Sequence, residues 1–310
     1  MAARIDGGAI VAGSYAGGWV IGEITASGQL NPRFARGGWS VLPFEGTVTN
    51  VLQETSGRII LGGNEHASGC CTVNWAAALS ADGQLDPMFG EHGRVKLPTG
   101  ESSGINRLAL EPNGDILAQS GYGNMGCWGT ALAMLTPSGA PEPLFAERLR
   151  RFWDGYHFGA FVGDTYLDGE GFTLVGAGQK PCFESPRDPK PPTTGVIAHF
   201  QTNGNPAGPT AQFPSPMYGT VKAFRDGGDT LIVAFPYSDE TGQVTVTARH
   251  ADGSLDPRFG ILGRAQIHIP LRSGELSLEA LEFIKAAPGE LTLVVTPSED
   301  AEVQLIRLRL

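Results

Sequence analysis

Basic residues are scarce in this chain, which has 22 lysines and arginines against 32 aspartates and glutamates, a formal net charge of −10. No stretch concentrates positive charge, which argues against nucleic acid and against anionic membrane surfaces as partners. No apolar run approaches the ~20 residues that a membrane span requires. Residues 1–6 show no signal-peptide pattern and lead directly into the rest of the chain. We therefore expect a monomeric globular protein without a membrane span.

The chain also lacks a helical pattern of convincing length, and it lacks common catalytic signatures. Neither a Gly-x-Ser-x-Gly elbow nor a His-Glu-x-x-His helix occurs. Glycine and proline are abundant, at 44 and 22 residues, as is natural for many short strands joined by turns. These absences favour a binding protein over an enzyme.

One phrase recurs along the chain with variations. It reads Gly-Gln-Leu-Asn-Pro-Arg-Phe at 28–34, Gly-Gln-Leu-Asp-Pro-Met-Phe at 83–89 and Gly-Ser-Leu-Asp-Pro-Arg-Phe at 253–259, with degraded copies at 139–145 and 204–213. Four glycines that open β-rich runs follow one another at intervals of 57 residues: Gly57, Gly114, Gly171 and Gly228. Periods of this size indicate stacked copies of one supersecondary unit.

Each copy predicts four antiparallel strands, which we label a, b, c and d. In the second copy they cover 47–54, 58–61, 75–80 and 94–97, with a turn at Asp82-Gly83. Six copies predict an all-β, six-bladed β-propeller in a single domain, 1–310. The last blade is either three-stranded or closed by the N-terminus. The expected repeats are 1–46, 47–103, 104–160, 161–217, 218–275 and 276–310.

The phrase Asp-Gly-x-Leu-Asp-Pro-x-Phe-Gly, clearest at 82–90 and 252–260, resembles the delta-60 repeat family. The resemblance covers nearly the whole chain in degraded form. It implies propeller-like modules of exported or surface-associated bacterial proteins, and it implies no catalytic residues.

The four cysteines fall in the loops between strands b and c of three consecutive copies: Cys70 and Cys71, Cys127, and Cys182. All b–c loops of such blades emerge on one face together with the d–a connections, which we call the b–c/d–a face. Two disulfides in an oxidising compartment would explain the even number, with three pairings open, and place the protein in a secreted, periplasmic or cell-surface location. Zinc held by the thiols with His66 is the competing explanation, although adjacent cysteines chelate one ion poorly.

Aromatic and polar residues are predicted on the same face. Ring faces can stack on sugars or peptides while polar groups orient them, so we expect a glycan, peptide or protein partner there. The candidate contacts are Tyr122, Asn124 and Trp128 in the third b–c loop, Trp153, Asp154, Tyr156 and His157 in the following d–a connection, and His66 in the second b–c loop. An enzyme would find a general base in His66 with Glu65, or in His157 with Asp154, where the carboxylate could orient the imidazole.

Two metal hypotheses also follow from the sequence. The repeat-phrase carboxylates Asp86 and Asp256 either bind Ca²⁺ or, as we favour, cap turns. Side chains of the a strands line a propeller's tunnel, so Asn50, Asn106, Asp164 and Glu282 could ring a Ca²⁺ ion, as in six-bladed lactonases. This alternative is a calcium-dependent hydrolase or lactonase, whereas the main hypothesis needs no cofactor.

Overall fold

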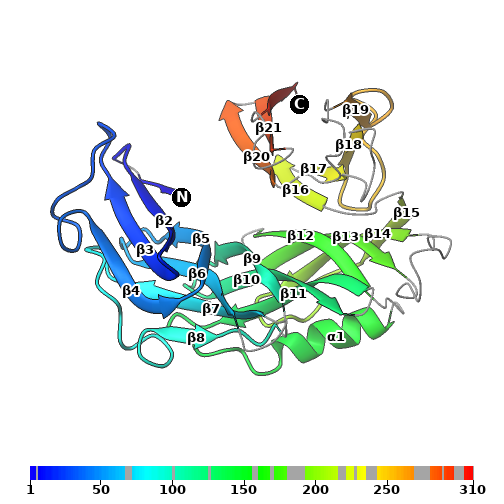
Figure 1. Cartoon of the computed structure of the whole chain (residues 1–310). Coiled ribbons are helices and arrows are strands. Elements are labelled where there is room, and N and C mark those ends of the chain that lie inside the picture. Colours follow the sequence, from blue (N-terminus) through cyan, green and yellow to red (C-terminus); the bar gives the residue numbers. More distant parts are fainter. Residues whose placement is uncertain are drawn as a thin grey trace. The chain divides into compact units, whose positions relative to one another are not determined.

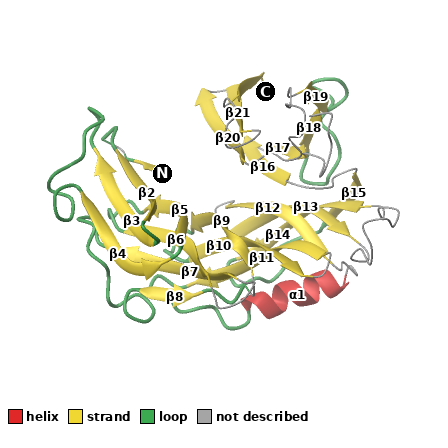
Figure 2. Cartoon of the chain, viewed as in Figure 1, coloured by secondary structure: helices red, strands yellow, loops and turns green. Residues whose placement is uncertain are grey.

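In a computed structural model of the protein, nearly all described residues belong to β-strands or the turns between them (Figures 1 and 2). They group into two compact units, one containing Met1–Phe152 and the other most of the chain from Trp153 onward. None of the described helices could span a membrane. The structure describes residues 1–4, 6–66, 72–99, 102–124, 127–155, 160–167, 171–179, 193–215, 221–226, 229–234, 243–268, 280–287, 290–296 and 304–309.

Three sheets form the first unit. The first sheet contains β1 (Ala2–Ala3), β2 (Ala9–Tyr15), β3 (Gly18–Ile24) and β4 (Trp39–Glu45). The second contains β5 (Thr47–Gln53), β6 (Ile59–His66), β7 (Thr72–Leu79) and β8 (Arg94–Lys96). The third contains β9 (Ser102–Leu110), β10 (Ile116–Asn124) and β11 (Cys127–Leu135), and it is followed by the helix α1 (Phe145–Gly155).

Three further sheets form the second unit. The fourth sheet contains β12 (Ala160–Leu167), β13 (Gly171–Gln179), β14 (Thr193–Gln201) and β15 (Ala211–Ser215). The fifth contains β16 (Val221–Asp226), β17 (Asp229–Ala234), β18 (Gln243–Arg249) and β19 (Arg264–His268). The sixth contains β20 (Ala280–Ala287), β21 (Glu290–Thr296) and β22 (Gln304–Arg309).

Each sheet is an antiparallel meander whose strands neighbour one another in chain order. The first strands of successive sheets lie side by side: β5 beside β9 in the first unit, and β12 beside β16 and β16 beside β20 in the second. Side chains join them, since the Thr49 hydroxyl donates to the Ile105 carbonyl at 2.7 Å. Successive meanders joined along their first strands are the blades of a propeller. The fold is therefore all-β and of the propeller type, as the sequence predicts.

The third sheet departs from the four-strand prediction. The helix α1 occupies the chain where the fourth strand was expected (Figure 2), so the expectation of no helix was wrong. The repeat phrase is degraded here to Pro-Glu-Pro-Leu-Phe, and the following Ala-Glu-Arg-Leu-Arg-Arg consists of good helix formers. Phe145 and Leu149 bury one face of the helix, and Arg151 pairs with Glu147 one turn earlier on the other.

Both faces of the inner sheets are buried. In the second sheet, Ile59 and Leu61 pack against the first sheet, while Ile60 between them packs against the third, and all three are fully buried. Because successive strand residues point to opposite faces, burial on both faces produces an uninterrupted apolar run. The same packing joins the fifth sheet to the sixth through Val244 and Leu291.

The repeat phrase forms the junction between successive sheets. Its phenylalanine lies over the glycine of the next sheet's turn between strands c and d, in the pairs Phe34–Gly83, Phe89–Gly139, Phe145–Gly204 and, from strand β15, Phe213–Gly253. Backbone hydrogen bonds accompany two of these contacts: Ala35 N to the Asp82 carbonyl, and Gly90 N to the Ser138 carbonyl, both at 2.9 Å. The phrase therefore packs between neighbouring blades.

Candidate functional site

The b–c hairpins carry most of the candidate contacts that the structure describes. His66 is the exposed last residue of β6, and Tyr122 and Asn124 lie in the last three residues of β10. Trp128 is the second residue of β11. The sequence placed Tyr122, Asn124 and Trp128 in a loop, which was wrong: their backbone continues the two strands to a tip of only two residues, 125–126. Tyr, Trp and Thr favour strands, and no proline interrupts them.

These hairpins extend beyond the strands beside them. β6 and β7 remain paired to His66↔Thr72, whereas the neighbouring strand β5 ends its pairing at Asn64. β10 and β11 remain paired to Asn124↔Cys127, whereas the described part of β9, which begins at Ser102, reaches Tyr122. The ends of both hairpins are thus two-stranded ribbons that project past the a strand of their sheet.

An ion pair lies at the base of the second-sheet hairpin. Arg94 Nη1 of β8 is 3.4 Å from Glu65 Oε2, and the guanidinium lies over the Trp75 ring at 4.1 Å from the ring centroid. Glu65 is therefore bound by an arginine, which does not support the hypothesis that it orients His66 as a base. The second base hypothesis involves His157, which, like Tyr156, lies outside the described residues.

Trp153 occupies a different place from the one the sequence suggested. It belongs to the last turn of α1 and is half-buried, with its ring 6.4 Å from that of Phe200 at an interplanar angle of 59°. Phe200 is itself stacked on Phe172 at 5.1 Å and is the second-last residue of β14. The Trp153 ring therefore lies near the c–d end of that strand, not its b–c end. Asp154 beside it is exposed.

The cysteine hypotheses fall largely outside the described part of the chain. Cys70, Cys71 and Cys182 are among the residues that the structure does not describe, and Cys127 is the first residue of β11. Two disulfides and a zinc site both remain predictions.

Asn50 and Asn106, two of the predicted calcium ligands, come together. Asn50 Nδ2 lies 3.4 Å from the Asn106 carbonyl oxygen across the neighbouring inner strands β5 and β9. The side chain of Glu282, in β20, is outside the described residues. Among the residues that are described, no three His, Cys, Asp or Glu side chains gather where they could hold a metal ion.

Asp164 has a structural role of its own. It is almost fully buried, and its carboxylate accepts hydrogen bonds from Thr165 N at 3.0 Å and from Ala223 N at 3.1 Å, which ties β12 to β16. Asp164 pairs with Val175 of β13, whereas Asn50 pairs with Gly62 of β6. In the aligned repeats Val175 corresponds to Leu61, so the two partners differ by one position along the b strand. A shift of one residue turns a strand side chain to the other face, so Asp164 is not equivalent to Asn50.

The acidic residues of the repeat phrase cap turns. Asp86 Oδ1 accepts from Met88 N, and Asp256 Oδ1 accepts from Arg258 N, both at 3.0 Å. Asn31 makes the same bond to Arg33 N at 3.1 Å. An amide oxygen accepts this hydrogen bond as well as a carboxylate oxygen does, which explains why the position varies between Asn and Asp. A series of Ca²⁺ sites along the repeats would require a carboxylate more consistently.

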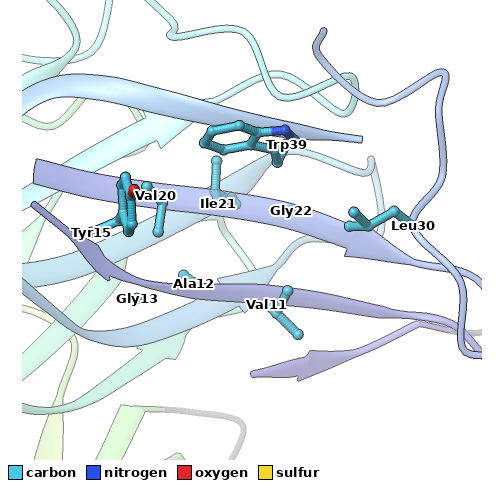
Figure 3. A pocket seen from close by; sticks show the side chains of 9 residues that line it. All are labelled: Val11, Ala12, Gly13, Tyr15, Val20, Ile21, Gly22, Leu30 and Trp39. Carbon is cyan, nitrogen blue, oxygen red and sulfur yellow. The ribbon is translucent and has the colours of Figure 1, made fainter. Parts of the chain in front are cut away.

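Sequence reasoning missed an apolar hollow on the first sheet (Figure 3). It encloses about 380 Å³, with Val11, Val20 and Trp39 from three neighbouring strands along it and Tyr15 and Leu30 at its two ends. Tyr15, Leu30 and Trp39 are 69%, 49% and 47% exposed, so large apolar side chains line an open surface. Such surfaces usually mark an interaction.

The repeat explains why the hollow exists. Val11 pairs with Gly22 in the first sheet as Leu61 pairs with Ala77 in the second. Leu61 and Ala77 are fully buried because the first sheet packs over them. The hollow is thus the face that the preceding sheet covers elsewhere, and aligning the repeats would have revealed it.

No family model and no curated protein matches this chain. Among solved structures it is similar to a glucose dehydrogenase (15% identity, TM-score 0.44, 97% of this chain and 95% of that chain) and to the polysaccharide lyase Uly1 (9%, 0.43, 99% and 88%). It is also similar to the Nup133 β-propeller domain of Vanderwaltozyma polyspora (10%, 0.41, 98% and 82%). Because these identities and TM-scores are low, the assignment to the propeller type rests on the chain's own sheets and on the pairing of neighbours among their first strands.

Proposed function

We propose that this chain is a binding module that recognises a glycan, a peptide or a protein partner through the projecting ends of its b–c hairpins. The observation that carries the proposal is the extension of the β6–β7 and β10–β11 hairpins past their inner strands. The backbone of a hairpin that extends past its inner strand has no neighbouring strand on that side. The repeat supplies a rigid support beneath these hairpins, and contacts on rigid elements lose less entropy on binding.

The residue types at the hairpin ends suit this role. Tyr122 and Trp128 bring large rings, and Asn124 and His66 bring groups that donate and accept hydrogen bonds. Aromatic residues dominate binding hot spots, because they bury much area with little loss of conformational freedom. We further propose a secreted, periplasmic or cell-surface location, on the strength of four cysteines predicted in loops of one face.

Glycan and peptide arrays probed with the full chain test the proposal, followed by calorimetric titration of the hits. We expect Trp128→Ala and Tyr122→Ala each to weaken binding at least tenfold, which corresponds to about 1.4 kcal/mol. Trp39→Ala is the matched control, because it removes a tryptophan that lies at the hollow of the first sheet and not at a hairpin end. Hits that respond equally to all three substitutions would contradict the proposal, and so would arrays without hits.

The second candidate is a calcium-dependent hydrolase or lactonase, favoured by the proximity of Asn50 to the Asn106 carbonyl on inner strands. Asp164 weighs against it, because backbone amides already occupy its carboxylate. A calcium enzyme would lose thermal stability on addition of EDTA and regain it with excess CaCl₂, since a bound ion stabilises the folded state. An unchanged melting temperature together with a metal-free elemental analysis would rule this candidate out.

We also propose that the six sheets close into the ring that the sequence predicts. A closed ring would leave no sheet face open, and the apolar hollow on the first sheet is a face of the kind that such closure buries.

A further inference from the structure

Arg249, the last residue of β18, is a buried cation at a position that is apolar in the other sheets. Each c strand ends in a bridge to its c–d turn, and in the first four sheets the bridging residue is Ile24, Leu79, Leu135 or Phe200. In the fifth sheet it is Arg249, which is only 7% exposed. Burial of a charge costs free energy unless a partner of opposite charge compensates for it.

The described residues around Arg249 offer it no carboxylate. Its guanidinium lies over the Phe213 ring, 3.7 Å from the ring centroid, and Nη1 donates to the Gly253 carbonyl at 2.6 Å. Nε is buried and has no hydrogen-bond partner. Burial, together with repulsion by Arg264, lowers the pKa of Arg249 to about 10, so the side chain still carries its charge at neutral pH. A carbonyl oxygen and an aromatic ring do not neutralise that charge.

Arg264 of β19 is a second arginine on the same face of the fifth sheet. It pairs with Thr247, and Arg249 lies two residues beyond Thr247, so the three side chains point to one face. Ala248 between them packs toward the sixth sheet, so this face is turned to the fourth sheet of the same unit. Diagonal neighbours on a sheet are within reach of long side chains. Arg264 is exposed, and it forms no ion pair with a described residue.

The second sheet shows how such an arginine is neutralised elsewhere in the chain. Arg94 occupies in β8 the place that Arg264 occupies in β19, and Glu65 Oε2 lies 3.4 Å from its Nη1. The fifth sheet instead has two arginines and no described carboxylate beside them. Guanidinium groups bind carboxylate and phosphate oxygens through paired hydrogen bonds. We propose that an oxyanion, the carboxylate or phosphate group of a small-molecule ligand, binds between Arg249 and Arg264.

Thermal unfolding of the full chain in sodium phosphate, sodium acetate and sodium chloride of equal ionic strength tests the proposal. A ligand that binds the folded state raises the melting temperature. Phosphate also stabilises proteins without binding to a site, and Arg249→Leu measures that part, because it restores the apolar residue of the other sheets. We expect phosphate or acetate to raise the melting temperature of the unmodified chain by about 2 °C more than that of Arg249→Leu. The anion that does so identifies the group that binds.

Two further arginine variants sharpen the test. Arg264→Gln changes an exposed side chain, so the fold should tolerate it, and we expect it to weaken the affinity for the anion at least tenfold. Arg33→Gln is the matched control, because Arg33 is exposed in the first sheet. It should leave the response to the anion unchanged.

Three outcomes would overturn the proposal. The first is the same melting temperature in all three salts, and the second is a response to the anions that Arg249→Leu or Arg264→Gln retains in full. The third is a loss of stability in Arg249→Leu that is equal in every salt, which would make Arg249 a structural contact of Phe213. The hairpin variant Trp128→Ala should keep the response to the anion, so this proposal and the proposed function fail independently.

Discussion

The glycine of the c–d turn in the second sheet meets two requirements at once. Gly83 has φ of +78°, a conformation that L residues with a side chain rarely adopt, and a Cβ at this position would lie 2.5 Å from the Phe34 ring. Gly28 forms the same turn in the first sheet with φ of +79°, but nothing lies within 4 Å of its Cβ position. Substitutions at the two glycines therefore distinguish the free-energy cost of backbone strain, present at both, from the cost of crowding against Phe34, present only at Gly83.

We expect Gly28→Ala to lower the free energy of unfolding by about 1 kcal/mol, from backbone strain alone. Gly83→Ala should cost about 2 kcal/mol more, because the added methyl group displaces the Phe34 ring from a packed junction. Urea unfolding followed by circular dichroism measures both. Equal costs for the two substitutions would contradict the role of the phenylalanine in joining the sheets.

At the scale of elements, the repeat period predicted the antiparallel meanders. It did not predict the elements that depart from the period, namely α1 and the long β10–β11 hairpin. Ile59, Ile60 and Leu61 predict a strand buried on both faces, and Asp82-Gly83 predicts the turn that follows β7. The helix α1 was not predicted. The repeat implied a strand at this position, although the residues of the segment themselves favour a helix. The sequence predicted a loop at the ends of β10 and β11, although the Tyr, Trp and Thr found there favour strands.

The last turn of α1 yields a prediction about Trp153. Its half-buried ring packs against Phe200, so Trp153→Ala should lower the free energy of unfolding by about 2 kcal/mol through lost apolar contact. Binding of any partner at the hairpin ends should be unchanged. Arg151→Ala is the control, because the Arg151 side chain is 71% exposed on the same helix. Thermal unfolding and titration of an array hit measure the two effects; loss of binding without loss of stability would restore Trp153 as a contact.

At the scale of the whole molecule, the sequence predicted the class of fold but little of the site. The repeat specifies which faces are apolar, and thereby the packing of each sheet on the next. Alignment of the repeats also identifies the apolar face of the first sheet that carries the hollow, although no motif marks it. Of the predicted calcium ligands, Asp164 was misjudged because a register shift of one residue is invisible without strand pairing.

Ring closure leads to a measurable expectation for the hollow. Hydroxyl-radical footprinting should find Trp39, Tyr15 and Leu30 protected if the ring is closed, because another sheet face then excludes water from them. Met88, which is 81% exposed, provides the unprotected reference within the same sample. Leu30→Asp should then destabilise the protein by about 2 kcal/mol, since it buries a charge. Ring closure would be contradicted if all three residues were fully labelled and Leu30→Asp left the free energy of unfolding unchanged.

The junction between a phenylalanine and the following glycine turn also gives the chain a direction of assembly. In the first four sheets the phenylalanine belongs to one sheet, and the glycine turn that it covers belongs to the sheet synthesised next. During translation, every completed sheet would therefore display an unshielded aromatic ring until the following repeat has emerged from the ribosome. Truncation from the C-terminal side would leave such a ring exposed, whereas truncation from the N-terminal side would leave only a vacant glycine turn. Shortened forms that lose N-terminal repeats should accordingly stay more soluble than those that lose C-terminal ones.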